Sequence, residues 1–413
     1  MNPEKFNLNR NDLETIVGRC FSDLKMKFNL NSAIVKPFSA SRVGYLGDHF
    51  ILELKVNSVS GEREQNLNLF LKVLPERIPS LTRYLEAIGT FRKEVRLYRD
   101  LFPKLSQFTR FAPEAYLSKD DRLLVFENLQ LKGFRTISNT DTGIFDKAHL
   151  EKALEALAKF HCASLMLETK TGRTLPELCP GALDENCWIR KENNPRVEEL
   201  QNAIDVLCEL VKVVECENEN LSDILEKLPP FMLQIYELVK PSSSSRNVAC
   251  HGDLWGSNLM FQYSDDGVPL DCLIVDFQFT RYAPPAYDVN MLLTLTTTGE
   301  FRKQYYRELI DYYYSCVRQE FIVQCLSPEE IFPERQFQES CQRYRISGLI
   351  DNFLMNHVTL LPRSCVDQVF SSPENYNNFS GQDKIKMCLD VLESDAKYRT
   401  RLTGIIRDLV EAL

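Results

Sequence analysis

The segment from His251 to Asp276 constrains the fold more than any other part of the chain, because it sets three oxygen-bearing side chains at fixed intervals. It reads HGDLWGSNLMF, then a turn at residues 265–267, then an apolar strand ending in LIVDFQ. Asp253 and Asn258 lie five residues apart on one predicted loop. The strand is expected to return along a hairpin and to bring Asp276 to the same place.

Phosphoryl transfer requires this set of groups. One carboxylate must orient or accept the proton of the attacking hydroxyl, and hard oxygen ligands must hold magnesium against the phosphates. The spacing of Asp253 and Asn258 is that of the kinase catalytic loop, and Asp276 takes the place of the aspartate in D-F-G. We therefore predict Asp253 as the catalytic base, with Asn258 and Asp276 as metal ligands.

Each residue also has an ordinary structural interpretation. Asp253 would serve as a turn residue, Asn258 as a helix cap and Asp276 as a strand-end aspartate. The joint pattern favours the functional interpretation, because the three positions, the hairpin and the strand occur together. For His251 we favour structural support of the loop over direct chemistry.

A second signal is a lysine within an apolar strand. In LFLKVL, Lys72 projects from the face opposite to that of Leu71 and Val73, and it needs a counter-charge. Glu94 falls on the apolar face of the next predicted helix, so the two charges are expected to pair. In kinases this pair allows the lysine to hold the α- and β-phosphates. The alternative is two surface side chains that extend into solvent.

The remaining pattern predicts an α+β, two-lobed, protein-kinase-like fold. Residues 1–128 would form a small nucleotide-binding lobe, in which residues 50–56 and 67–73 make an antiparallel hairpin and residues 123–126 another strand. Residues 129–413 would form a large, mostly helical lobe with the catalytic loop, the metal site and the acceptor pocket. The expected helices cover residues 12–28, 81–101, 146–167, 301–324 and 337–361, with others beginning at Pro195 and after Pro229-Pro230.

The nucleotide contacts are less strongly marked. Gly44 and Gly47, in the stretch from residue 39 to residue 48, would let backbone N–H groups approach phosphates, although an ordinary turn explains them nearly as well. Glu127, Asn128 and Leu129 follow the last strand of the small lobe, where backbone groups are placed to bind adenine. The Glu127 side chain would then be a solvated charge.

Composition narrows the partners. The net charge of −9 comes without a basic patch, so no nucleic-acid binding is expected. The 13 scattered cysteines contain no C-x-x-C pair, which is typical of a reducing compartment. A polar N-terminus and the lack of a long apolar run predict a cytoplasmic protein without membrane association. No obligate protein partner is evident.

With these pieces in order, the chain resembles the insect ecdysteroid-kinase-like (CHK kinase-like) family, relatives of choline kinases and aminoglycoside phosphotransferases. The motifs that carry the resemblance are LFLKVLP, FRKEVRLY, LVFENL, LAKFHCASL, HGDLWGSN, IVDFQ and PPAYDVNMLL. The resemblance implies an ATP- and magnesium-dependent kinase that phosphorylates a hydroxyl of a small molecule, such as an ecdysteroid or a foreign alcohol. It also implies that Asp288 braces the catalytic loop, where the alternative is a helix N-cap.

The acceptor pocket is expected in residues 291–298 and in the helices beyond Phe337, whose apolar side chains suit an apolar ligand. Three rival interpretations stay open. A choline- or ethanolamine-type kinase would need an aromatic or acidic cage. A pseudokinase would be expected to lack Lys72, Asp253 or Asp276, and a protein kinase would be expected to carry an A-P-E segment, which we do not find.

Overall fold

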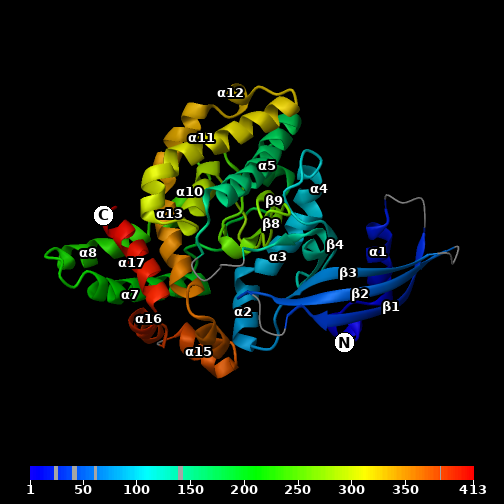
Figure 1. The fold of residues 1–413 in the computed structure, drawn as a ribbon, viewed down its shortest axis with the longest axis horizontal. Coiled ribbons are helices and arrows are strands. Elements are labelled where there is room, and N and C mark those ends of the chain that lie inside the picture. Colours follow the sequence, from blue (N-terminus) through cyan, green and yellow to red (C-terminus); the bar gives the residue numbers. More distant parts are fainter. Residues whose placement is uncertain (23–26, 40–43, 60–62, 138–142, 382) are drawn as a thin grey trace.

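The computed structural model describes residues 1–22, 27–39, 44–59, 63–137, 143–381 and 383–413. Its N-terminal part contains a five-stranded antiparallel sheet in the order β1-β2-β3-β5-β4, drawn in blue to cyan at one end of the molecule (Figure 1). The strands are β1 (Phe28–Pro37), β2 (Asp48–Ser58), β3 (Glu64–Val73), β4 (Ala115–Lys119) and β5 (Leu123–Glu127). The predicted hairpin is therefore confirmed as β2 and β3, with Leu52 opposite Leu69.

The first helix is shorter than predicted. A short 3₁₀ turn (Pro3–Phe6) is followed by α1 (Arg10–Cys20), and Phe28 begins β1 instead of ending the helix. Asn9 and Asp12 form a reciprocal cap at the N-terminus of α1. The sequence pattern missed β1 because the strand lies at the sheet edge, where Val35 is its one buried residue.

The predicted helix over residues 81–101 is also wrong as a single element. Gly89 has φ of 69°, a conformation that glycine adopts without strain, and it separates α2 (Pro79–Ile88) from α3 (Thr90–Arg96). A wider π turn (Leu97–Leu101) and α4 (Phe102–Leu105) complete the run. The break gives α3 an orientation independent of that of α2.

Helices dominate the rest of the chain. The elements are the 3₁₀ turn Leu129–Lys132, α5 (Lys147–Thr171), α6 (Leu175–Leu178), α7 (Pro195–Val214), α8 (Leu221–Met232), α9 (Ile235–Leu238), α10 (Pro285–Leu295), α11 (Gly299–Val323), α12 (Pro328–Ile331), α13 (Glu334–Thr359), α14 (Arg363–Val369), α15 (Pro373–Ser380), α16 (Asp383–Ser394) and α17 (Ala396–Val410). Pro229 and Pro230 lie inside α8, whereas the sequence pattern placed them before a helix. The helix ends two residues later, so these prolines fall in its last turn. No helix in the described part of the chain combines the length and the apolar character needed to cross a bilayer.

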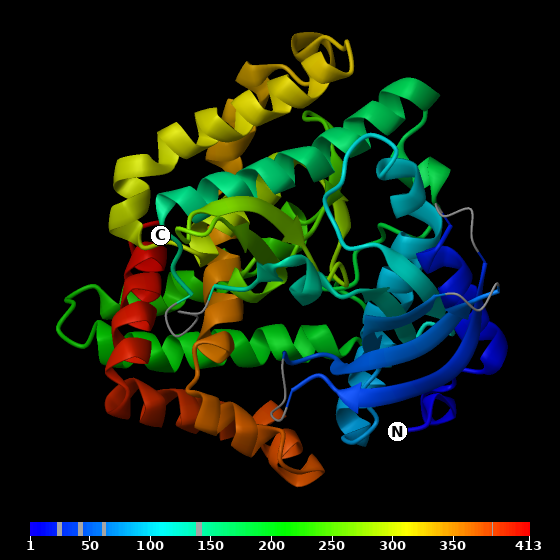
Figure 2. The same ribbon diagram turned by 45° about the vertical axis from the view of Figure 1, so that its right-hand side comes forward.

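Short strands hold the segment from residue 248 to residue 283 against these helices. β7 (Val248–Cys250) pairs with β10 (Arg281–Ala283), while β8 (Leu259–Tyr263) and β9 (Pro269–Ile274) form the predicted hairpin, which β6 (Phe134–Arg135) extends. This hairpin lies near the centre of the molecule, with α5 running across it (Figure 2). The loop after β7 and the end of β9 therefore meet inside the protein.

Two separate hydrophobic cores flank the N-terminal sheet. One lies between α1 and the sheet and includes Leu52, Leu54 and Leu71. The other is continuous from α2 through the C-terminal helices and also contains Leu124 and Phe126 of β5. The last strand of the sheet thus shares a core with the helical part of the chain.

Candidate active site

Lys72 connects the sheet to Glu94, the carboxylate that the sequence pattern proposed for it, and also to Asp276, which was predicted only as a metal ligand. Its Nζ lies 2.5 Å from Glu94 Oε2 and 2.7 Å from Asp276 Oδ1, and its side chain is almost completely buried. Burial alone would lower the pKa of Lys72, but the charges of Asp276 and Glu94 raise it above its usual value. The lysine therefore stays protonated. The predicted ion pair is present, and the alternative of two exposed side chains is wrong.

The end of β9 and helix α3 are locked together. The backbone N–H of Phe277 donates to Glu94 Oε1 over 3.2 Å, and Lys93 Nζ donates to the carbonyl of Thr280 over 2.7 Å. Asp276 itself has φ of 68°, a left-handed conformation that aspartate tolerates better than most residues. These contacts fix the direction in which the Asp276 carboxylate points.

Asp253 and Asn258 interact directly. Asn258 Nδ2 donates to the backbone carbonyl of Asp253 over 2.8 Å and to its Oδ2 over 3.0 Å. The other carboxylate oxygen, Oδ1, is buried and has no hydrogen-bond partner within the described part of the chain. Burial, and then the charge of Asp276, raise the pKa of Asp253 to about 8. Asp253 is thus a carboxylate with raised proton affinity and one unused acceptor atom.

The catalytic loop is supported as the sequence pattern suggested. His251 Nε2 lies 3.0 Å from the carbonyl of Val275, and its Nδ1 accepts the N–H of Asp253. Asp288 accepts the backbone N–H groups of His251 (2.5 Å) and Gly252 (3.0 Å). Asp288 lies inside α10, so it braces the loop and is not the N-cap.

Two supporting residues escaped the sequence analysis. His161 of α5 lies 3.1 Å from Asp288 Oδ2 through Nε2, and it was visible only as part of LAKFHCASL. Arg281 is buried behind the loop, close to Glu185 and Tyr287. Gly252 has φ of 74°, and an added Cβ would lie 2.6 Å from the Phe279 carbonyl. Only glycine fits between the loop and the segment that follows Asp276.

The site opens into a cavity of about 770 Å³ whose lining includes Lys72, Asp253, Asn258 and Asp276. Gly44 lines the cavity and has φ of 75°. A Cβ atom added to Gly47 would lie 3.4 Å from Cε of Lys72, so Gly47 passes close to the lysine side chain. Residues 40–43, between Ser39 and Gly44, lie outside the described residues.

The segment Glu127–Leu129 also borders the cavity. The carboxylate of Glu127 is buried, forms ion pairs with Arg110 and Lys132, and accepts the N–H of Glu114. Glu127 is therefore not a solvated charge, and its side chain holds the neighbouring segments in place. Any contact of Glu127 with a nucleotide would therefore come from its backbone.

The other side of the cavity differs in part from the expected acceptor region. Of residues 291–298, Met291 alone is among the residues that line it. The helices after Phe337 contribute as predicted, through Leu354, Met355, His357, Val358, Val366, Val369, Phe370, Tyr376, Phe379 and Lys384. Trp188, Arg196 and Glu199 line it as well. Sequence reasoning missed Arg196 and Glu199 because α7 shows an ordinary amphipathic pattern, and it missed Trp188 because that residue lies in the irregular segment before α7.

The donor set suits a magnesium ion. Both amide hydrogens of Asn258 are directed at Asp253, which leaves its Oδ1 for a cation. Asp276 Oδ2 accepts the amide of Gln278, at 3.2 Å. A carboxylate and an amide oxygen are hard ligands of the kind that magnesium prefers. Gln278 is another site residue that sequence reasoning left without a role, and its buried Oε1 has no partner among the residues described.

The buried lysine, the loop aspartate with its asparagine and the strand-end aspartate are the groups that phosphoryl transfer requires. The chain belongs to the ecdysteroid kinase-like family, whose sequence model matches residues 44–323. It is accordingly a small-molecule kinase. A search of curated proteins finds no match. Among solved structures, a microcompartment-associated aminopropanol kinase is similar at 11% identity and a TM-score of 0.36, over 91% of this chain and 98% of that one.

Proposed function

We propose that the protein transfers the γ-phosphate of ATP, with magnesium, to a hydroxyl of an apolar metabolite, an ecdysteroid or a xenobiotic alcohol. The observation that carries the proposal is the unpartnered Oδ1 of Asp253. Asp253 borders the cavity. Lys72 and Asp276 line one side of that cavity, and apolar helices line the other. A nucleotide and an alcohol can therefore meet at Asp253.

Residues 1–128 supply the nucleotide half of this proposed arrangement and residues 129–413 supply the rest. Lys72, held by Glu94, binds the α- and β-phosphates, and the backbone of residues 127–129 contacts adenine. Asn258 and Asp276 hold magnesium, which would neutralise charge on the phosphates. A cytoplasmic setting is part of the proposal, and the 13 free cysteines agree with it.

Asp253 acts as the base. It accepts the proton of the acceptor hydroxyl while that oxygen bonds to the γ-phosphorus, and the bond to the oxygen bridging the β- and γ-phosphates breaks to leave ADP. Asn258 holds the Asp253 carboxylate in one orientation. Burial raises the proton affinity of Asp253, which a base needs, and a bound magnesium ion would favour the ionised carboxylate before transfer.

The lining of the acceptor side supports an apolar alcohol. It is built largely from leucine, valine, methionine and aromatic side chains of α13, α14 and α15. A choline-type acceptor is less well supported, because the face of Trp188 is already covered by Arg196, whose Cζ lies 4.0 Å from the ring centroid. A second cation would be repelled there.

A mass-spectrometric screen tests the proposal. The purified protein, ATP and magnesium are incubated with a panel of ecdysteroids and plant or xenobiotic alcohols, and products heavier by one phosphoryl group are sought. The matched controls are Asp253→Asn, expected to give no product, and Asp266→Asn in the exposed turn, expected to behave as wild type. Magnesium-dependent ATP binding without any phosphorylated product would instead indicate a ligand-binding pseudokinase.

A further inference from the structure

The acceptor side of the cavity contains a buried histidine whose hydrogen-bonding state is fixed by its surroundings. His357 of α13 is 3% exposed, and its Nδ1 lies 2.8 Å from the carbonyl of Phe353. A carbonyl oxygen can only accept, so Nδ1 carries the proton and Nε2 presents a lone pair. Nε2 has no hydrogen-bond partner among the residues that the structure describes, although the residue borders the cavity.

The ring is held neutral and in place. It stacks on Phe353 with ring centroids 5.0 Å apart and an interplanar angle of 9°. Burial, and then the charge of Lys384, lower the pKa of His357 to about 4. Its backbone carbonyl accepts the hydroxyl of Tyr398 over 2.8 Å. The Nε2 lone pair is therefore a fixed acceptor at neutral pH.

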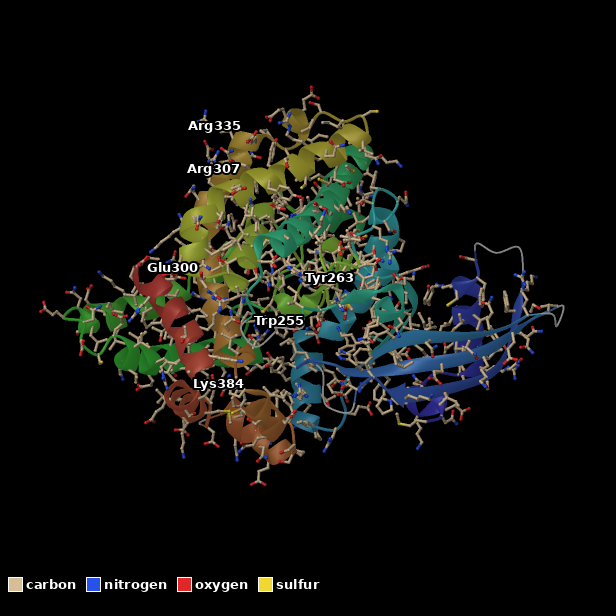
Figure 3. The ribbon with its side chains drawn as sticks, viewed as in Figure 1. Trp255, Tyr263, Glu300, Arg307, Arg335 and Lys384 are labelled. Carbon is tan, nitrogen blue, oxygen red and sulfur yellow. The ribbon has the colours of Figure 1, made fainter. Side chains whose placement is uncertain are left out.

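Lys384 supplies a donor beside this acceptor. It lies in the first turn of α16, one turn before Cys388, whose Sγ contacts the carbonyl of His357. Lys384 is 6% exposed and borders the cavity, and its Nζ lies over the ring of Phe379. Among the described residues, no carboxylate forms an ion pair with it. The nearby carboxylate of Glu199 is already bound to Arg196. Figure 3 places Lys384 at the α15–α16 edge and Trp255, beside the catalytic loop, nearer the centre.

We propose that His357 Nε2 and Lys384 Nζ form a recognition site for a second hydroxyl group of the acceptor, distant from the hydroxyl that Asp253 deprotonates. A hydroxyl donates one hydrogen bond and accepts others, so it satisfies both groups at once. A carboxylate would satisfy Lys384 but meet the histidine lone pair, and a quaternary ammonium would have no proton for Nε2. The preferred acceptor is thus an apolar molecule with a hydroxyl group at each of two ends. This inference rests on the proposed function, because it takes this cavity as the acceptor site.

Intrinsic fluorescence measures binding to this cavity, because both tryptophans of the chain, Trp188 and Trp255, border it. The probes are androstanediol, with a hydroxyl at each end of a rigid apolar ring system, and androstanol, which lacks one of them. We expect wild type to bind the diol about tenfold more tightly, the size of one good hydrogen bond. His357→Leu and Lys384→Met should each reduce the ratio of the two affinities to about one. His357→Gln, which keeps a hydrogen-bond acceptor, should retain part of the preference for the diol.

Lys386→Met is the matched control, because Lys386 is exposed on the same helix and should leave the ratio unchanged. Asp253→Asn should also keep the diol preference while losing phosphate transfer. If wild type prefers the diol but transfers no phosphate, the proposed kinase function is refuted and the recognition site is not. Equal or absent binding of the two probes by wild type, or a preference that survives in both His357→Leu and Lys384→Met, would overturn the inference.

Discussion

The two sides of the cavity are assembled in opposite ways. On the nucleotide side, Lys72, Glu94 and Asp276 bind one another, so the charges are paired before any ligand arrives. On the acceptor side, His357 Nε2 is buried without a hydrogen-bond partner among the described residues, as is one oxygen of Asp253 at the boundary between the two sides. Buried polar atoms without partners are costly, which indicates that a ligand satisfies them. The proposed nucleotide side is thus preorganised, whereas the proposed acceptor side leaves polar atoms for a substrate to satisfy.

The largest effect is expected at the boundary between the two sides. Replacing Asp253 by Asn removes the proton acceptor but keeps the shape of the side chain, so kcat should fall about 10²–10⁴-fold while ATP still binds. Steady-state kinetics with an acceptor from the screen measures this loss, with Asp266→Asn as the reference. A variant with wild-type kcat would show that Asp253 is not the base.

The paired charges predict a large effect on stability as well. Lys72→Met leaves Glu94 buried without its cation and should lower the free energy of unfolding by about 3–5 kcal/mol. The double variant Lys72→Met/Glu94→Gln should regain much of that stability but none of the phosphate transfer. Denaturant unfolding measures both, and Lys55→Met, on the exposed face of β2, is the matched control. Equal stability of the single and double variants would contradict the pairing.

The sequence predicted the nucleotide side better than the acceptor side, for a physical reason. Asp253, Asn258 and Asp276 lie on one hairpin unit, so local spacing determines their geometry. Lys72 and Glu94 each place a charge at an apolar position, which predicted that the two side chains form an ion pair. Whether these residues perform the predicted chemistry stays a prediction.

The acceptor side could not be predicted in this way. His357 and Lys384 come together only because α13 packs near α16, and nothing in their local patterns marks them. Likewise, β1 was missed because an edge strand buries few apolar side chains. The break at Gly89 was missed because one glycine does not interrupt an apolar pattern.

A smaller effect is expected behind the catalytic loop. Asp288→Asn keeps one acceptor oxygen but turns an amide toward the backbone N–H groups of His251 and Gly252, which should cost about 1–3 kcal/mol of stability. The loosened loop should lower kcat with little change in the KM for ATP. A change confined to the KM for ATP would show that Asp288 acts on the nucleotide side instead.

A further effect concerns the pH dependence of stability. The pKa of Asp253 is raised from 3.8 to about 8 on folding, so between these values the folded state keeps a proton that the unfolded state has lost. Its contribution to stability is complete below about pH 4 and is lost as the pH rises through about 8. Asp253→Asn should therefore gain in Tm relative to wild type as the pH rises from 4 to 8. A constant difference in Tm across that range would contradict the raised pKa.

Calorimetric titration with ATP tests most directly whether the preorganised side holds a nucleotide with magnesium. We predict that wild type binds ATP more tightly with magnesium than with EDTA, and that Asp276→Asn loses this gain while remaining folded by circular dichroism. Equal ATP affinity with and without magnesium, unchanged in Asp276→Asn, would contradict the account.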